Sequence, residues 1–132
     1  MPLKLTLKPD EKVLIGTAVI TNAGQKSEII IQNTVPVLRE KDIITAENAD
    51  TIPKQIYHVI LNMYVESKNE KEYHEIYFKL VKELFTACPD QVVLAIIMEV
   101  SQKILEGNHY QALKKCKKLL NFEAELLANV PR

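Results

Sequence analysis

The side chains able to act as nucleophiles, general bases or metal ligands are few in this 132-residue chain and are scattered along it. The histidines lie at positions 58, 74 and 109, which we expect on separate elements and without the spacing of a ligand set. We expect His58 on the polar face of its helix and His74 in a solvated setting. Cys88 and Cys116 match no metal-binding pattern, and no serine stands in a nucleophile-elbow motif. The glycines, at 16, 24 and 107, make no phosphate-cradling loop. The sequence therefore predicts no enzyme, no cofactor and no metal site.

Binding is the chemistry that the remaining residues favour. Arginine occurs twice against fifteen lysines, and Arg39 is the only arginine away from the chain end. Its planar guanidinium suits bidentate contacts with phosphate or guanine edges and stacking on bases, and Lys41 adds charge two residues later. The alternative is that the guanidinium only forms a surface ion pair, which contributes little. The nearby carboxylates are Glu11, Glu40 and Asp42.

The last predicted helix, about residues 108–128, divides into an apolar and a basic face at 100° per residue. The apolar arc holds Ala112, Leu113, Cys116, Leu119, Leu120, Leu126 and Leu127. The opposite arc holds Lys114, Lys115, Lys117 and Lys118, with Tyr110 and Phe122 beside them. Such a face could hold a phosphate backbone with stacked bases. It could equally receive an acidic partner helix, or be an ordinary solvated face.

The net charge of zero is a sum of unequal parts. Residues 1–43 carry six basic and five acidic side chains, residues 44–107 carry six and ten, and residues 108–132 carry five and two. A polyanion would be repelled by the middle and admitted at the ends. The longest apolar run has seven residues, far short of the ~20 of a membrane span, and the start lacks a secretory signal. With no disulfide framework, the cytoplasm is the expected compartment.

The first third has the period of strands. Leu3, Leu5 and Leu7 alternate with polar residues, and a turn follows at Pro9-Asp10. Gly16 predicts a bend or bulge within the next strand, and residues 28–32 predict a return strand after a turn at 22–24. Residues 35–38 predict a further extended piece, and Pro36, which has no N–H for a strand ladder, places it on an edge strand or at a strand start. A short sheet with exposed edges favours pairing of two copies, so a homodimer through these strands is expected.

From Thr45 onward the period is 3.6, which predicts four helices. The first begins near Asp50-Thr51, and the others cover about 69–87, 91–106 and 108–128. We expect the third, the most apolar, to be central, and Ile76 of the second to point inward. The predicted fold class is thus α+β: a small antiparallel β-sheet subdomain, residues 1–44, followed by a bundle of about four helices, residues 45–132, packed together as one domain.

The chain resembles the flagellar FlbT family along nearly its whole length. The resemblance lies in the runs Leu3-x-Leu5-x-Leu7-Lys8-Pro9-x-Glu11-Lys12, Ile15-Gly16-x-Ala18-Val19, Val35-Pro36-Val37-Leu38-Arg39-Glu40-Lys41, Thr51-Ile52-Pro53-x-x-Ile56-Tyr57 with Met63-Tyr64, and Gly107-x-x-Tyr110-x-Ala112-Leu113-Lys114. It implies a cytoplasmic post-transcriptional regulator that associates with the 5′ untranslated region of flagellin mRNA and promotes its decay, with FlaF as a functional partner. In some species the family acts as an activator.

Residues 3–43 alone look like the small RNA-binding regulator CsrA. The likeness lies in the alternating leucines, Glu11, Ile15-Gly16, the turn glycine at 24 and Val37-x-Arg39-Glu40-x-x-Ile43. In CsrA the first and last strands come from different protomers of an intertwined dimer, and their edges hold GGA-containing single-stranded loops. Carried over by position, Leu3, Lys4, Val37 and Arg39 would line that edge. The tract between Gly24 and Val35 is shorter here, and CsrA has no large helical portion.

Two functional hypotheses follow. The leading one is an RNA-binding regulator that occupies the flagellin mRNA leader and promotes its degradation or blocks its translation. Arg39 and Lys41 would make specific contacts with the RNA, and the basic face of the last helix would attract its phosphate backbone. The alternative is a protein-interaction adaptor or chaperone-like module that engages FlaF or flagellin, with indirect effects on mRNA. The negative middle, the zero net charge and the amphipathic helices favour it.

Overall fold

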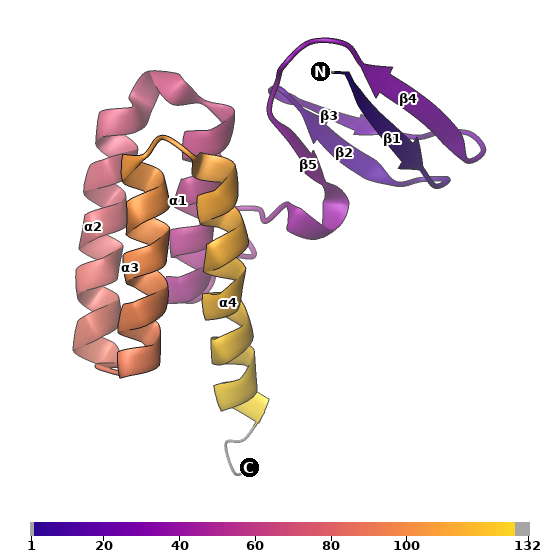
Figure 1. Ribbon diagram of the computed structural model, residues 1–132. Helices are drawn as coiled ribbons and strands as arrows, with labels where there is room; N and C mark the ends of the chain where they lie inside the picture. Colours follow the sequence, from indigo (N-terminus) through magenta and orange to yellow (C-terminus); the bar gives the residue numbers. More distant parts are fainter. Residues whose placement is uncertain (1, 129–132) are drawn as a thin grey trace. The chain divides into compact units, whose positions relative to one another are not determined.

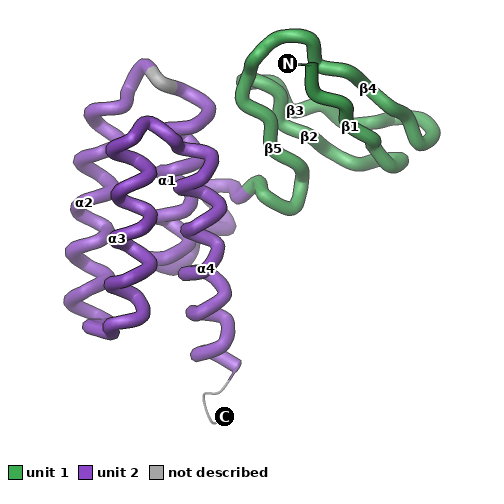
Figure 2. The backbone as a smooth tube through the Cα atoms, viewed as in Figure 1, with its two compact units in different colours: residues 1–43 green, residues 44–132 purple. Residues whose placement is uncertain are grey.

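The structure, a computed structural model, describes residues 2–128 apart from the side chain of Ser67. It divides the chain into two compact units, residues 1–43 and residues 44–132 (Figure 2). Strands form the first, which we call the strand unit, and helices form the second, the helical unit (Figure 1). The predicted α+β class is confirmed.

The strand unit has five short strands in two antiparallel sheets. In one sheet, β1 (Leu3–Leu7) pairs with β4 (Ser27–Ile31). In the other, β2 (Lys12–Ile15) lies between β3 (Ala18–Thr21) and β5 (Val37–Arg39). The strands thus make two small sheets rather than one, because β4 pairs with β1 and does not return along β3. A 3-10 turn at residues 40–42 follows β5.

A small apolar core holds this unit together. Leu5, Leu7 and Val13 are buried at its centre, and half-buried side chains pack against them from the other strands: Ile15, Ile29, Ile31 and Val37. Gly16 has a φ of 62° and starts the two-residue turn from β2 to β3. The expected bend inside a strand is therefore wrong at this position, because the positive φ serves a hairpin turn.

The helical unit consists of four helices that lie side by side (Figure 1). They are α1 (Ile52–Val65), α2 (Glu70–Ala87), α3 (Gln91–Leu105) and α4 (His109–Ala128). Polar side chains cap the starts of α1, α3 and α4, whereas none of the described side chains caps α2. The Thr51 hydroxyl accepts a hydrogen bond from the Lys54 N–H at 3.3 Å, and the Asn108 side-chain oxygen accepts one from the Gln111 N–H at 3.2 Å.

Helices α1 and α4 each pack on two neighbours, so the expectation that α3 would be the central helix is wrong. Ile56 and Ile60 of α1 have no exposed surface, because α1 packs against both α2 and α4. Helix α3 packs mainly on α4, so its outer face stays exposed. Ile76 of α2 was also expected inside but is 46% exposed. High apolar content does not tell how many neighbours a helix has.

The end of α4 departs from its predicted apolar arc. Ala112, Leu113, Cys116 and Leu119 are buried, whereas Leu126 and Leu127 are exposed. Helix α4 has 20 residues, against 14 in α1 and 15 in α3. At about 1.5 Å per residue its last turns run past the ends of the helices that cover its apolar face. Among the described residues, no helix combines the length and apolar character needed to cross a bilayer.

Candidate nucleic-acid interface

Arg39, at the end of β5, is held in place by its neighbours in the strand unit. Its Nη1 donates to the Thr6 carbonyl oxygen at 3.3 Å and lies 3.7 Å from a carboxylate oxygen of Glu11. The ion pair with Glu11 was the alternative reading of the sequence, and it is present. The Arg39 side chain nevertheless keeps 39% of its surface exposed. A guanidinium has five N–H donors, so these two contacts leave donors for a ligand.

The other residues expected at the strand edge have different surroundings. Lys4, on β1, pairs across to Glu28 on β4 at 3.2 Å, and both side chains are more than half exposed. Leu3 is 43% exposed, and Lys41 lies exposed in the turn after β5. Val37 is half-buried and packs against the core of the strand unit. Part of the Val37 side chain thus stays accessible at the edge, and its contact with a ligand stays a prediction.

The four lysines of α4 do not form one uniform basic face. Lys115 and Lys118 both reach Glu99 on α3, at 3.7 Å and 3.3 Å. One carboxylate thus offsets part of the charge of two ammonium groups. Lys117 is half-buried, while Lys114 is exposed and turns back along its own helix.

Lys114 belongs to an aromatic cluster that reaches from α4 to α1. Its ammonium nitrogen lies 5.1 Å from the ring centre of Tyr110, a distance that allows a cation–π interaction. The Tyr110 ring in turn stacks at a tilt on Tyr64, with 5.7 Å between ring centres. Sequence reasoning placed Tyr110 beside the lysines but missed Tyr64. Tyr64 lies near the end of α1, and only the packing of α1 on α4 brings the two rings together.

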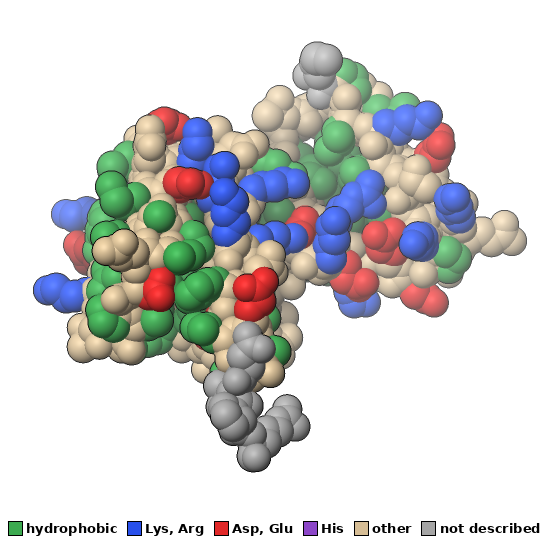
Figure 3. Space-filling view, turned by 60° about the horizontal axis from the view of Figure 1, so that its bottom comes forward, with side chains coloured by type: hydrophobic (Ala, Val, Ile, Leu, Met, Phe, Trp, Pro, Cys, Tyr) green, Lys and Arg blue, Asp and Glu red, His purple; other side chains and the backbone are tan. Residues whose placement is uncertain are grey.

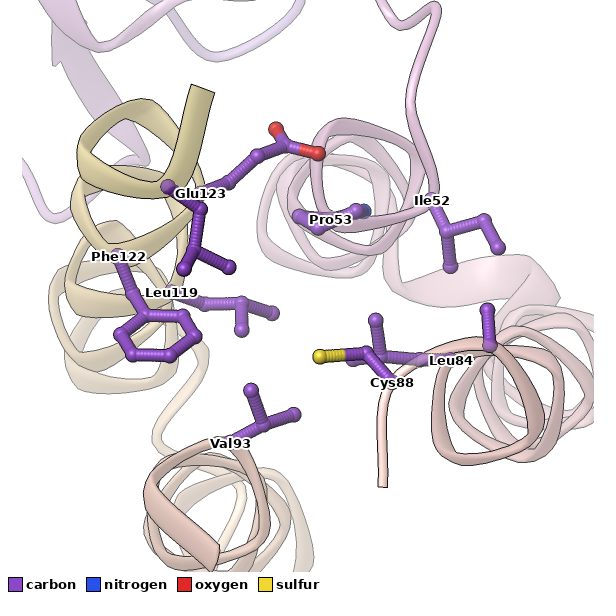
Figure 4. A pocket seen from close by; sticks show the side chains of 10 residues that line it. Ile52, Pro53, Leu84, Cys88, Val93, Leu119, Phe122 and Glu123 are labelled. Atoms are coloured by element: carbon purple, nitrogen blue, oxygen red, sulfur yellow. The ribbon is translucent and has the colours of Figure 1, made fainter. Parts of the chain in front are cut away.

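Phe122, the second aromatic expected beside the lysines, points elsewhere. It lines an apolar pocket of about 210 Å³ at one end of the bundle, where side chains of all four helices face one another (Figure 4). Glu123, on the same rim, accepts a hydrogen bond from the Thr51 hydroxyl at 2.9 Å. Phe122 therefore belongs to this pocket and not to the basic face.

The comparisons with known proteins decide the family. Residues 3–127 match the family model described as flagellar protein FlbT. The chain belongs to the FlbT family. This confirms the resemblance seen in the sequence, whereas the likeness of the strand unit to CsrA stays a prediction.

Three FlbT relatives cover nearly the whole chain. One, named a probable flagellum biosynthesis repressor protein from Rhodopseudomonas palustris, is 41% identical over 97% of this chain and 99% of its own. A second of that name, from Bradyrhizobium diazoefficiens, is 40% identical over 96% of this chain and 85% of its own. The flagellum biosynthesis repressor protein FlbT of Caulobacter vibrioides is 32% identical over 98% and 92%. No solved structure matches the chain.

In this FlbT-family chain, two of the three histidines come together, which the sequence spacing did not predict. His74 on α2 and His109 at the start of α4 both face Glu70, with Nε2 to carboxylate distances of 3.6 Å and 3.7 Å. The expectation of a solvated setting for His74 is wrong at its Nε2 atom, which is buried. The histidines do lie on separate elements, as expected, and the packing of the helices brings two of them together. Glu70 and His74 are four residues apart on one helix face, a signal visible in the sequence, but His109 joins them only through the fold.

The two cysteines of the FlbT-family chain have different environments. Cys116 is fully buried under the apolar face of α4, as expected, and burial raises the pKa of its thiol to about 12. Cys88 is half-buried at the end of α2 and lines the apolar pocket. A thiol with so high a pKa is not a nucleophile at neutral pH, so Cys116 acts as a small apolar side chain.

Proposed function

We propose that this FlbT-family chain is a regulator of flagellin expression that binds the single-stranded 5′ untranslated region of flagellin mRNA. Binding would promote degradation of the message or block its translation. The names of the relatives, flagellum biosynthesis repressors, support a repressing role. The family resemblance supports the leader RNA as the target. The observation that carries the proposal is the cluster of Lys114, Tyr110 and Tyr64 beside the other lysines of α4.

This cluster offers the two things that a flexible RNA strand needs. An aromatic ring next to a cation can stack a base while the ammonium group meets the neighbouring phosphate. Stacking of a base on an aromatic side chain is worth about 1–3 kcal/mol and tolerates any base. The packing of Tyr110 on Tyr64 holds the ring in place before the RNA arrives, which lowers the cost of ordering it.

Glu99 sets how strongly α4 attracts a polyanion. A phosphate that contacts Lys115 or Lys118 must compete with this carboxylate. Since exposed ion pairs contribute only about 0–1 kcal/mol to stability, an RNA phosphate can displace the Glu99 carboxylate from these lysines at a small energetic cost. Replacing Glu99 with Gln removes the competitor, so the Glu99→Gln variant should bind RNA more tightly.

The strand unit would add a second contact through Arg39. Its guanidinium is fixed by Thr6 and Glu11, so a preorganised donor stands beside the exposed Lys41. A fixed fork suits a phosphate or a guanine edge. Arg39→Lys keeps the positive charge but loses the bidentate guanidinium. The variant therefore separates specific hydrogen bonding to the RNA from electrostatic attraction.

The experiment is a titration of fluorescently labelled flagellin leader RNA with purified chain at several salt concentrations, read by anisotropy. If all four α4 lysines contact phosphates, the logarithm of affinity should fall against that of salt with a slope of about −3. Lys114→Ala should reduce this slope by about 0.7, and Tyr110→Leu should weaken binding about 5- to 100-fold. Lys79→Ala, which removes an exposed lysine of α2, is the matched control. Equal affinities of all variants, or a flat salt dependence, would refute RNA binding at α4.

A second candidate function rests on the exposed apolar surface of the helical unit. Leu94, Met98 and Leu105 of α3 are 45%, 64% and 75% exposed, and Phe78 of α2 is 52% exposed. Hydrophobic side chains are plainly visible on the surface of this unit in Figure 3. The three α3 residues are four and seven positions apart, so they share one exposed helix face, and exposed apolar faces often mark sites of protein interaction. This surface favours an adaptor that engages FlaF or flagellin, with indirect effects on mRNA.

Co-elution tests the adaptor. The chain should co-elute with FlaF or flagellin after nuclease treatment, and Met98→Lys should abolish the complex while leaving RNA binding unchanged. Co-elution that disappears when RNA is digested would count against the adaptor and favour the leader RNA as the link.

A further inference from the structure

We propose that Glu70, His74 and His109 bind one divalent transition-metal ion, with Zn²⁺ as the reference case, where α2 and α4 begin. The ligand atoms of the three side chains all lie within 4.8 Å of one another. The site belongs wholly to the helical unit and does not depend on RNA or protein binding.

The distances fit a metal site that closes by a small movement. The Glu70 carboxylate oxygen lies 3.6 Å from Nε2 of His74 and 3.7 Å from Nε2 of His109. Two ligands on one tetrahedral Zn²⁺, with bonds of about 2.0–2.1 Å, stand about 3.3 Å apart. The present separations are too long for hydrogen bonds and only a few tenths of an ångström wider than this spacing. The ligand atoms of all three side chains lie within 4.8 Å of one another, so the two imidazoles must also move toward each other to enclose an ion.

The polar atoms at the centre lack hydrogen-bond partners. Nε2 of His74 and Nε2 of His109 are buried, and neither makes a hydrogen bond within the described part of the chain. Buried polar atoms without partners are rare because their desolvation is not repaid. Two such nitrogens aimed at the same carboxylate are explained if all three groups share an ion.

The types of the three side chains also suit a metal ion. Neutral imidazole is the form that binds metals. Two imidazoles and one carboxylate are a common ligand set for Zn²⁺ and also suit other first-row divalent ions.

Three protein ligands leave at least one coordination position open. The cluster borders a shallow surface hollow lined by Lys71, Glu75 and Phe78 beside Glu70 and His74. Water can reach the ion there, so an exchangeable ligand would complete the coordination. The ion would tie the start of α2 to the start of α4. Tyr110, directly after His109, would then be steadied together with the first turn of α4.

The test uses the full-length chain without a histidine tag, freed of metal by a chelator that is then removed. Co²⁺ and Zn²⁺ are titrated separately, Co²⁺ by its visible absorption, which reports coordination geometry, and Zn²⁺ by calorimetry. We expect one ion per chain and a melting temperature that rises with the ion and falls again with chelator. His74→Ala, His109→Ala and Glu70→Gln should each weaken binding at least tenfold.

Matched controls separate this site from adventitious binding. His58→Ala removes the histidine outside the cluster, and Cys88→Ser removes the half-buried thiol; both should bind like the wild type. His74→Gln and His109→Asn repeat the ligand test with polar side chains, and far-UV circular dichroism checks the fold. The proposal is overturned by absent binding in the wild type, by binding that survives loss of both histidines, or by binding that needs Cys88.

Discussion

The two units of the molecule differ in how much core each contains. Among the described residues, the strand unit buries five apolar side chains, whereas the helical unit buries eighteen besides Pro53. A unit of 43 residues is close to the size below which a core alone seldom holds a fold. The helical unit therefore has the larger stabilising core and acts as the scaffold. We expect the strand unit to depend for much of its stability on contacts with a binding partner.

The largest effect is expected from the core of the helical unit. Ile60 has no exposed surface and lies on α1, which packs against both α2 and α4. Ile60→Ala should lower the free energy of unfolding by about 2–5 kcal/mol, because the change leaves a cavity that the bundle cannot fill. Urea unfolding followed by circular dichroism at 222 nm measures it. A loss below about 1 kcal/mol would mean that α1 is not central.

The same kind of change in the strand unit should act locally. Leu7 is 3% exposed in the small core with Leu5 and Val13. Leu7→Ala should lower the free energy of unfolding of the strand unit by about 2–5 kcal/mol, which is a large share for a unit with so small a core. Hydrogen exchange should show the strand amides exposed while the helical signal at 222 nm persists. A single cooperative transition for both variants would contradict the distinction between the units.

The exposed strand β3 should be where two copies meet, if the strand unit is completed by a second chain. Val19 and Ile20 point to opposite faces of β3 and are 61% and 41% exposed, and β3 has β2 as its one partner in the sheet. Such an edge favours strand pairing between copies. Sedimentation should show a dimer, and Val19→Lys should raise its dissociation constant at least tenfold. A wild type that stays monomeric at high concentration contradicts this.

The sequence predicted the helical elements well because their signals are local. Thr51, Asn108 and Gly107 mark helix ends by their own chemistry, and the helices begin and end within about two residues of the predicted positions. The strands were harder. Which strand pairs with which depends on contacts far apart in the sequence, so β4 was expected beside β3 and lies beside β1.

The candidate sites were predictable only in part, for the same reason. The lysines of α4 and Tyr110 share one helix, so their spacing showed them together. Glu99 and Tyr64 come from other helices. Glu99 offsets part of the charge of the α4 lysines, and Tyr64 packs against the ring of Tyr110. His109 joins Glu70 in the same way. A site that spans two helices needs the packing to be known.

The smallest expected effect is a pH dependence confined to the helical unit. All three histidines lie there, and none lies in residues 1–43. Burial lowers the pKa of His58 on α1 below its ordinary value of about 6.5. As the pH falls through about 6.5, the unfolded chain therefore takes up a proton before the folded chain does. The free energy of unfolding should fall from there to the folded pKa, and stay level above about pH 7.5.

His58→Gln should flatten this slope, and urea unfolding between pH 5 and 8 measures it. The variant removes only part of the dependence, because burial also lowers the pKa of His109. The strand unit provides the internal comparison. Its amide exchange, corrected for the intrinsic effect of pH, should not change over the same window. A response of equal size in both units would mean that they unfold together, and the contrast between scaffold and dependent unit would then be wrong.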